Sequence, residues 1–368
     1  MIITKTIHCK VIGLTKKKQQ LLNKEYLEAV KLSNLLNEAR STGNMLNFNY
    51  KNVNAELYSL TKSGILFKAS RARQKRGKLL YLYAQSIRIK KTENKLSKFW
   101  MKIPIYKVFG GIWIALQFSK KYENLLENGK LKSSIVSKKN GNYYVYLCLE
   151  KDVQIMDNYQ NILAVDLGEK VMATVCGSFD KGRPRFFGRE VRGIRRHYAW
   201  LYKRLGERRL LKKIKSIGQT EKRKVDSVLH KISSQIVKLA EQNNAIIVLG
   251  ELKGIRKSAK GKKMRRIVSS MPYHKLTHYI EYKANWAGIA VKRINEKNTS
   301  KTCSNCGQLG IRKTQGSFVC HGCGYQANAD HNGAKNILKR SLEYISKDGA
   351  IGYAQKFLKE GVSTTVQT

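Results

Sequence analysis

Four cysteines in the last quarter of the chain have the spacing of a zinc site. Cys303 and Cys306 form one Cys-x-x-Cys pair, and after thirteen intervening residues Cys320 and Cys323 form a second pair. Each pair can bind one side of a metal ion, and the loop between them allows the four thiolates to complete a tetrahedron. A site with four cysteine ligands is coordinatively closed, so we predict structural zinc rather than a catalytic ion.

Three acidic residues are placed to bind a second kind of metal. Asp166 and Glu251 each follow an apolar, strand-like run, and Asp330 comes seven residues after the last cysteine. In-line hydrolysis of a phosphodiester needs an activated water and stabilised charge on the leaving oxygen, and two Mg²⁺ ions provide both. Carboxylates must hold such hard cations. A single acid after a strand is commonly a turn residue or helix cap, but the three together predict a magnesium-dependent nuclease.

The charge of the chain predicts a polyanionic partner. Lys and Arg total 72 against 25 Asp and Glu, which gives a net charge of +47 over 368 residues. Such an excess repels itself in the folded state unless a polyanion neutralises it, so we expect a nucleic acid. The chain has no run of eighteen apolar residues and no basic amphipathic terminal helix. We therefore expect no membrane partner.

The N-terminus lacks the layout of a signal peptide, which predicts a reducing compartment. In that setting the three cysteines outside the predicted zinc site are expected to be small buried hydrophobic residues rather than disulfides. They are Cys9, Cys148 and Cys176.

The C-terminal half has the element order of an RNase H-like nuclease. Apolar runs predict a meander of three strands over residues 162–165, 171–175 and 184–188, with Asp166 at the end of the first strand. A very basic helical stretch, a second helix and a buried strand ending at Glu251 come next. A helix over 272–287 and a strand over 289–294 lead to the cysteines, and Asp330 opens the final helix.

The N-terminal half predicts a β unit with a helical insertion. Residues 1–13 have strand composition, residues 16–100 have helical periodicity, and strands return from 101 to about 150. Cations and aromatic residues are mixed over residues 71–83. This stretch is either a solvated helix face or a contact with a phosphate backbone.

Several of these motifs resemble those of a known family. Asp166 in AVDLGEK, Glu251 in VLGELKGI, the cysteines in CSNCG and CHGCG, and Asp330 in ADHNGAKNI are similar to the split RuvC domain of the TnpB family. These proteins are transposon-encoded, RNA-guided DNA nucleases related to type V CRISPR effectors. The resemblance covers roughly residues 160–340; the N-terminal half is similar only in layout.

The resemblance implies an α/β fold in which an RNase H-like (RuvC-like) nuclease domain carries an inserted Cys₄ zinc ribbon. A wedge-like β-barrel with an inserted helical recognition block would precede it. The implied ranges are 1–14 and 101–155 for the barrel, 15–100 for the helical recognition domain, 156–298 and 326–347 for the nuclease domain, 299–325 for the ribbon, and 348–368 for a flexible tail.

The resemblance also implies the chemistry. Asp166, Glu251 and Asp330 would be the catalytic acids that bind magnesium, as two ions, while Cys303, Cys306, Cys320 and Cys323 would bind structural zinc. The expected partners are a guide RNA and double-stranded target DNA, with cleavage beside a short adjacent motif. The protein would be cytoplasmic, associated with the nucleoid of a prokaryote and with a transposable element. A monomer is expected, although the sequence leaves the oligomeric state open.

One position departs from the family pattern. The second acid of the family usually follows the apolar strand directly, but here Gly250 occupies that position and Glu251 comes one residue later. A one-residue shift in a regular strand sends the side chain to the opposite face. A bulge or an early strand end at Gly250 would return Glu251 to the expected face.

Two other functions fit part of the pattern. The first is a cleavage-deficient, RNA-guided DNA-binding repressor of the same fold, which would bind DNA without cutting it. The second is a guide-independent nuclease such as a junction resolvase, which would need no RNA. The retained Asp166 and Asp330 argue against the first, and the basic block before residue 100 has no role in the second.

Overall fold

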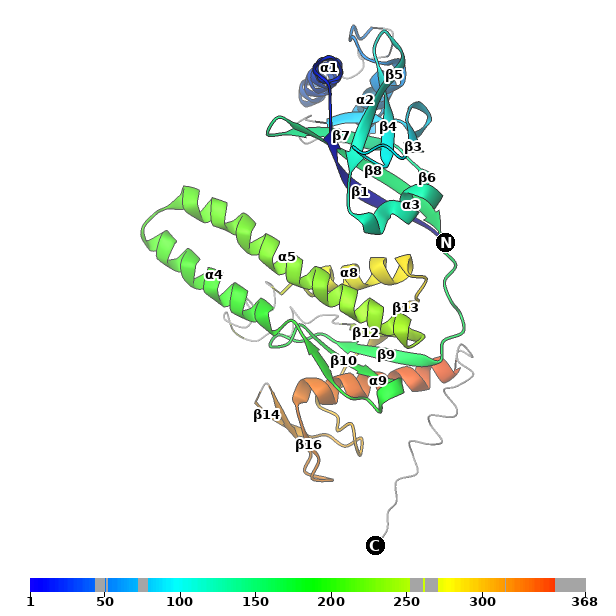
Figure 1. The fold of residues 1–368 in the computed structure, drawn as a ribbon. Helices are drawn as coiled ribbons and strands as arrows, with labels where there is room; N and C mark the ends of the chain where they lie inside the picture. Colours follow the sequence, from blue (N-terminus) through cyan, green and yellow to red (C-terminus); the bar gives the residue numbers. More distant parts are fainter. Residues whose placement is uncertain are drawn as a thin grey trace. The chain divides into compact units, whose positions relative to one another are not determined.

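The computed structural model describes residues 1–43, 50, 52–71, 79–251, 261, 271–314 and 316–347. The chain divides into two compact units, Ile2–Asp152 and Val153–Thr368 with Met1 (Figure 1). The predicted tail over 348–368 and most of the basic stretch over 71–78 lie outside the described residues.

The first unit contains an eight-stranded antiparallel sheet in the order β2-β7-β8-β1-β5-β4-β3, with β6 paired to β8. Its strands are β1 (Ile2–Ile12), β2 (Leu79–Leu82), β3 (Arg88–Lys91), β4 (Phe99–Ile105), β5 (Val108–Gln117), β6 (Lys130–Leu131), β7 (Ser134–Lys139) and β8 (Asn142–Asp152). Its helices are α1 (Lys16–Ser41), α2 (Ser59–Arg71) and α3 (Glu123–Asn128).

The helical block is shorter than predicted. Residues 16–41 and 59–71 are helical, but β2, β3 and the start of β4 fall within the range that we assigned to helices. Leu80 and Leu82 are buried while the residues between and before them are less so, which is the two-residue period of a strand. Strands of four residues are too short to interrupt the helical periodicity of a long window, and pairing of β2 with β7 decides their conformation.

The second unit is built on a five-stranded sheet in the order β11-β10-β9-β12-β13. β9, β10 and β11 form the predicted antiparallel meander, and β12 lies parallel to both β9 and β13. The strands are β9 (Asn161–Asp166), β10 (Ala173–Gly177), β11 (Arg185–Phe187), β12 (Ala245–Glu251) and β13 (Val291–Asn295). The helices are α4 (Arg189–Glu207), α5 (Leu211–Gln242), α8 (Tyr273–Trp286) and α9 (Ala329–Lys347).

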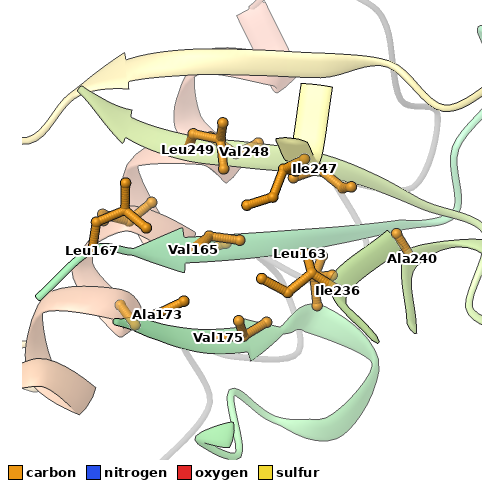
Figure 2. Close-up of a cluster of buried hydrophobic side chains, with 14 of the residues drawn as sticks. Leu163, Val165, Leu167, Ala173, Val175, Ile236, Ala240, Ile247, Val248 and Leu249 are labelled. Atoms are coloured by element: carbon orange, nitrogen blue, oxygen red, sulfur yellow. The ribbon is translucent and has the colours of Figure 1, made fainter. Parts of the chain in front are cut away.

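Helices cover both faces of this sheet. Figure 1 shows α5 and α8 over one face and α9 over the other. Residues 245–250 of β12 are all buried, as expected for a central strand packed on both sides. Side chains from β9, β10, β12 and α5 gather in the apolar core that Figure 2 shows. This core fixes the edge of the sheet at which β9 and β12 end.

The cysteine module is a small three-stranded sheet of β14 (Ile311–Thr314), β15 (Ser317–Val319) and β16 (Gln326–Ala327). It ends two residues later than the ribbon that we predicted, directly before α9. Among the described residues, no helix is both long enough and apolar enough to cross a lipid bilayer.

Candidate active site

The structure brings two of the predicted acids together. Asp166 is the last residue of β9, and Asp330 is the second residue of α9 with 8% of its surface exposed. A Cβ atom on Gly333, in the first turn of α9, would lie 2.6 Å from Asp166 Oδ2. A Cβ atom on Gly168 would lie 3.7 Å from Asp330 Oδ1. The end of β9 and the start of α9 therefore place both carboxylates in one cluster.

The start of α9 holds Asp330 in place. The side-chain oxygen of Asn328 accepts hydrogen bonds from the backbone N–H groups of Asp330, at 2.9 Å, and His331, at 3.3 Å. These bonds satisfy two N–H groups that the first turn of a helix leaves without partners. Asp330 therefore extends from a capped helix start rather than from a loose loop.

A third carboxylate, Glu296, belongs to the same cluster and was missed in the sequence. Burial raises the pKa of Asp166 to about 8; the charges of Glu296 and Asp330 add to this shift, and Arg312 opposes it. Burial also raises the pKa of Glu296 to about 7. Glu296 comes directly after β13, but two basic residues and an asparagine interrupt the apolar pattern of that strand, so no apolar run marked this acid as one marked Asp166.

Glu251 lies at the end of β12 and is not aligned with Asp166 across the sheet. β9 and β12 are in parallel register, with Val165 opposite Leu249, so the next position along places Asp166 beside Gly250. The pairing of β12 with β13 runs without interruption through Glu251. The structure thus shows neither the bulge nor the early strand end that would turn Glu251 toward Asp166.

A cation-lined cavity adjoins the acid cluster. It has a volume of about 390 Å³, and Asp330 and Asn328 form part of its wall. Four basic residues also line it, namely Lys170, Arg189, Arg192 and Arg196. Basic side chains around a hollow of this kind suit a phosphate backbone, whose charge they neutralise.

The cysteine module reaches the acid cluster through one arginine. Arg312 of β14 donates a hydrogen bond from Nη2 to Asp330 Oδ1 at 3.1 Å, and the two side chains form an ion pair. Burial raises the pKa of the Asp330 carboxyl, and Arg312 acts in the opposite direction. The guanidinium group therefore favours the charged form of Asp330, which is the form that binds a metal ion.

The four cysteines fit a zinc ion. The sulfur atoms of Cys303 and Cys323 are 3.7 Å apart, those of Cys306 and Cys320 are 3.5 Å apart, and all four lie within 4.8 Å of one another. A tetrahedron with Zn–S bonds of about 2.3 Å has sulfur atoms about 3.8 Å apart. Among the described residues, no other set of three or more such ligands is so tightly gathered. The carboxylates of Asp166, Glu296 and Asp330 therefore lie farther from one another than the four cysteine sulfur atoms do.

Two asparagines join the cysteine module to α9. Asn332 donates to the carbonyl of Thr302 at 2.7 Å and accepts from the N–H of Ser304 at 2.8 Å. Asn336, one turn later, donates to the carbonyls of Thr299 and Thr302. The sequence around Asp330 therefore both carries a carboxylate and fixes the first cysteine pair against α9.

Comparison with known proteins agrees with this arrangement. Residues 273–337 match the family model of the Cas12f1-like TNB domain, and this range contains Glu296, the four cysteines and Asp330. The TnpB-like protein MJ0751 of Methanocaldococcus jannaschii is 28% identical over 244 residues, which cover 60% of this chain and 86% of that protein. This chain is therefore similar in sequence to TnpB-like proteins.

Other proteins that this chain resembles are nucleases by name. The CRISPR-associated endodeoxyribonuclease Cas12f1 of Sulfoacidibacillus thermotolerans is 30% identical over 215 residues, or 53% of this chain and 49% of that protein. The putative RNA-guided DNA endonuclease InsQ of Escherichia coli is 27% identical over 244 residues, or 59% of each protein. The chain thus spans about half of the length of these two relatives.

A solved structure shares the fold. The Cas12f1 protein in a Cas12f1–sgRNA–target DNA complex superposes with a TM-score of 0.59 at 14% identity, over 88% of this chain and 83% of that one. The likeness confirms the predicted α/β architecture.

Proposed function

We propose that this chain is a TnpB-family RNA-guided DNA endonuclease, associated with a transposable element, that cuts target DNA beside a short adjacent motif. The observation that carries the proposal is the cluster of Asp166 and Asp330 beside a cation-lined cavity. The names of InsQ and Cas12f1 give this chemistry its most direct support. Guide RNA and double-stranded target DNA are the proposed partners.

The acid cluster suits magnesium. All of its donors are carboxylate oxygens, which Mg²⁺ prefers. Burial and mutual repulsion raise the pKa of Asp166 to about 8, so a bound cation would relieve an unfavourable concentration of negative charge. We infer that Asp166 and Asp330 bind two magnesium ions with a third carboxylate, for which the sequence suggested Glu251. When bound, the ions would activate the attacking water and stabilise charge on the leaving oxygen.

The surrounding residues would position the DNA strand. Lys170, Arg189, Arg192 and Arg196 would bind its phosphates and bring the scissile bond to Asp330. Asn328 and Arg312 would keep the Asp330 carboxylate oriented and charged. Sequence would be read by pairing of the guide with the target, so the protein needs few contacts to base edges.

Zinc would have a structural role. In this proposal it closes the two cysteine pairs and keeps the Thr299 and Thr302 carbonyls in reach of Asn336 on α9. Its contribution to cleavage would be indirect, because it supports the segment from which Arg312 reaches Asp330.

Cleavage of a plasmid tests the proposal. The protein is co-expressed with RNA from the region flanking its gene, then incubated with target plasmid in Mg²⁺ or EDTA, beside the Asp166→Ala variant. We expect guided double-strand cutting that requires both Mg²⁺ and Asp166. Guided binding without cutting would instead identify a repressor of the same fold, and cutting without RNA would identify a guide-independent nuclease.

A further inference from the structure

We propose that Glu296, rather than Glu251, is the third catalytic carboxylate of this site, and that Gly250 is the residue that leaves room for it. The inference rests on the proposed nuclease function and names the residue that completes its metal site. Gly250 and Glu296 would then act together: β12 has no side chain at position 250, and the Glu296 side chain, which follows β13, fills that space.

The Glu251 side chain points away from the face of the sheet that carries the site. The register of β9 with β12 places Asp166 beside Gly250, and residues aligned across a ladder point to the same face. A Cβ atom on Gly250 would lie 2.9 Å from Ile337 Cδ1 of α9, so this is the face that α9 covers. Side chains alternate along a strand, and Glu251 therefore points to the opposite face.

Glu296 returns to the face that Asp166 uses. Across the β12–β13 ladder, Ile294 pairs with Gly250 and Asn295 pairs with Glu251. Glu296 comes two residues after Ile294, so the alternation of the strand brings it back toward α9. A Cβ atom on Gly250 would overlap Glu296 Oε2 and would lie 3.5 Å from Glu296 Cβ. The carboxylate of Glu296 thus occupies the space into which a side chain at position 250 would extend.

The reach of a glutamate makes this exchange possible. Adjacent strands lie about 4.8 Å apart, which is close to the length of a glutamate side chain. A carboxylate that starts on β13 can therefore reach the space above β12, provided that β12 has no side chain there. Glycine at position 250 meets this condition, whereas any other residue would fill the space.

The backbone around Glu296 is firmly held. The N–H and hydroxyl groups of Thr299 donate to the Glu296 carbonyl at 3.1 and 2.8 Å. Arg340 of α9 donates to the carbonyls of Asn295, at 2.5 Å, and Lys297, at 3.2 Å. These bonds on both sides of Glu296 give its side chain a fixed starting point, as a metal ligand requires.

The carboxylate itself has an unsatisfied oxygen. Glu296 Oε2 is buried and has no hydrogen-bond partner among the residues that the structure describes. Burying a charged oxygen without a partner is costly, so such atoms in a native site call for a ligand. The space against Gly250, beside Asp166 and Asp330, is where a divalent cation would provide it.

Titration with Mn²⁺ tests the assignment without using cleavage. Full-length protein freed of nucleic acid is titrated calorimetrically as wild type, Glu296→Gln and Glu251→Gln, and circular dichroism checks that each variant is folded. We expect Glu296→Gln to weaken Mn²⁺ binding by about tenfold or more, as loss of a ligand should, with wild-type affinity in the matched Glu251→Gln control. Wild-type affinity in Glu296→Gln, or an equal loss in Glu251→Gln, would overturn the assignment.

Guided cleavage gives the second readout. We expect Glu296→Gln to cut at least about 100-fold more slowly than wild type and Glu251→Gln to cut within about threefold of it. If the wild-type protein did not cut at all, the proposed function would fail, but the Mn²⁺ titration would still decide the role of Glu296.

Moving the carboxylate back provides a rescue experiment. In the double variant Gly250→Glu with Glu296→Gly, the side chain would start from β12 and extend into the space that Glu296 has left. We expect it to recover at least about tenfold of the Mn²⁺ affinity lost in the single variant Glu296→Gly. No recovery in a folded double variant would contradict the inference that the two positions share one space.

Discussion

At the scale of single residues, the site depends on a glycine as much as on its acids. Asp166 lies against the backbone of α9 at Gly333, where a Cβ atom would come within 2.6 Å of Asp166 Oδ2. Contacts below about 3 Å between carbon and a carboxylate oxygen are strongly repulsive, so a side chain here must displace Asp166. The close approach of β9 to α9 therefore requires glycine at position 333.

The Gly333→Ala variant measures this dependence. We expect guided cleavage to fall at least about tenfold, because a displacement of an ångström or less at a catalytic group has large effects on rate. Gly206→Ala is the matched control, since Gly206 lies in α4 with nothing within 4 Å of its Cβ position. That variant should keep full activity and gain about 0.5–1 kcal/mol of stability. Equal rates in the two variants would contradict the prediction.

The raised pKa of Asp166 predicts a pH dependence of stability in EDTA. Between its ordinary value of 3.8 and about 8, the folded protein holds the Asp166 proton more tightly than the unfolded chain does. The folded state then binds more protons, so the free energy of unfolding decreases as pH rises through this window. Asp166→Asn lacks this contribution and should be more stable than wild type at pH 8 by on the order of 1–3 kcal/mol.

Urea unfolding of both proteins from pH 4 to pH 8 measures this difference. The two stability curves should converge toward pH 4, where Asp166 becomes protonated in both states of the wild type. Saturating Mg²⁺ should reduce the difference at pH 8, because a bound cation relieves the same repulsion. Parallel curves across the whole range would show that Asp166 does not titrate in this way.

At the scale of elements, α9 combines three roles along one helix. Its first turn carries Asp330, and Asn332 and Asn336 on successive turns bind the segment of the first cysteine pair. Ala334 and Ile337 are fully buried in the core under the sheet. The helix thus couples the fold of the cysteine module to the position of the Asp330 carboxylate.

Asn336→Ala should loosen this coupling. The variant leaves the carbonyl of Thr299 without the amide that binds it, whereas the carbonyl of Thr302 keeps its hydrogen bond from Asn332. An unsatisfied buried acceptor costs about 1–3 kcal/mol. We expect a stability loss in this range by urea unfolding. Lys339→Ala, at an exposed position of the same helix, should change stability by less than about 0.5 kcal/mol. A similar effect of both variants would argue against the coupling.

Zinc content tests the second metal site. We expect wild-type protein to carry about one zinc per chain and Cys306→Ser to lose most of it, since a four-cysteine site binds poorly with three thiolates. Elemental analysis after dialysis measures this directly. Cys148→Ser in β8 is the control, because that cysteine lies in the other unit, and it should retain its zinc. Zinc retained in Cys306→Ser would exclude this cysteine as a ligand.

At the scale of the whole molecule, charge decides the class of partner. The positive charges that give the chain its net charge of +47 over 368 residues repel one another. Binding to a nucleic acid relieves this repulsion, because Lys and Arg side chains replace the counterions of the phosphates. Part of this positive charge is concentrated in the cavity beside Asp330, where four of the lining residues are basic. Affinity for nucleic acid should therefore depend steeply on salt.

Filter binding of guided target DNA at several salt concentrations tests this expectation. Between 50 and 200 mM salt we expect affinity to fall by about 10³-fold or more, as for a protein with many phosphate contacts. Arg196→Ala in the cavity should reduce the slope of log affinity against log salt by about 1. Affinity that is independent of salt would remove the phosphate backbone as the main source of binding energy.

The sequence by itself determined the features that are local. The four cysteines are joined by one short loop, so their spacing was sufficient to predict a metal site before any fold was known. Asp166 and Asp330 were found because each lies at the end of an element, and patterns of apolar residues locate such ends. The order of strands and helices after residue 160 followed from the same periodicities.

Only the tertiary structure decided which third carboxylate faces the site. That choice depends on the register of three strands that lie far apart in the sequence, and a shift of one residue reverses the direction of a side chain. Glu251 follows an apolar run and Glu296 follows a strand of mixed composition, so the local pattern favoured Glu251 and gave no sign of Glu296. Likewise, the short strands β2 and β3 became part of a sheet through pairing with distant segments. Side-chain direction and strand pairing are relations between elements, which is why a reading along one chain leaves them undetermined.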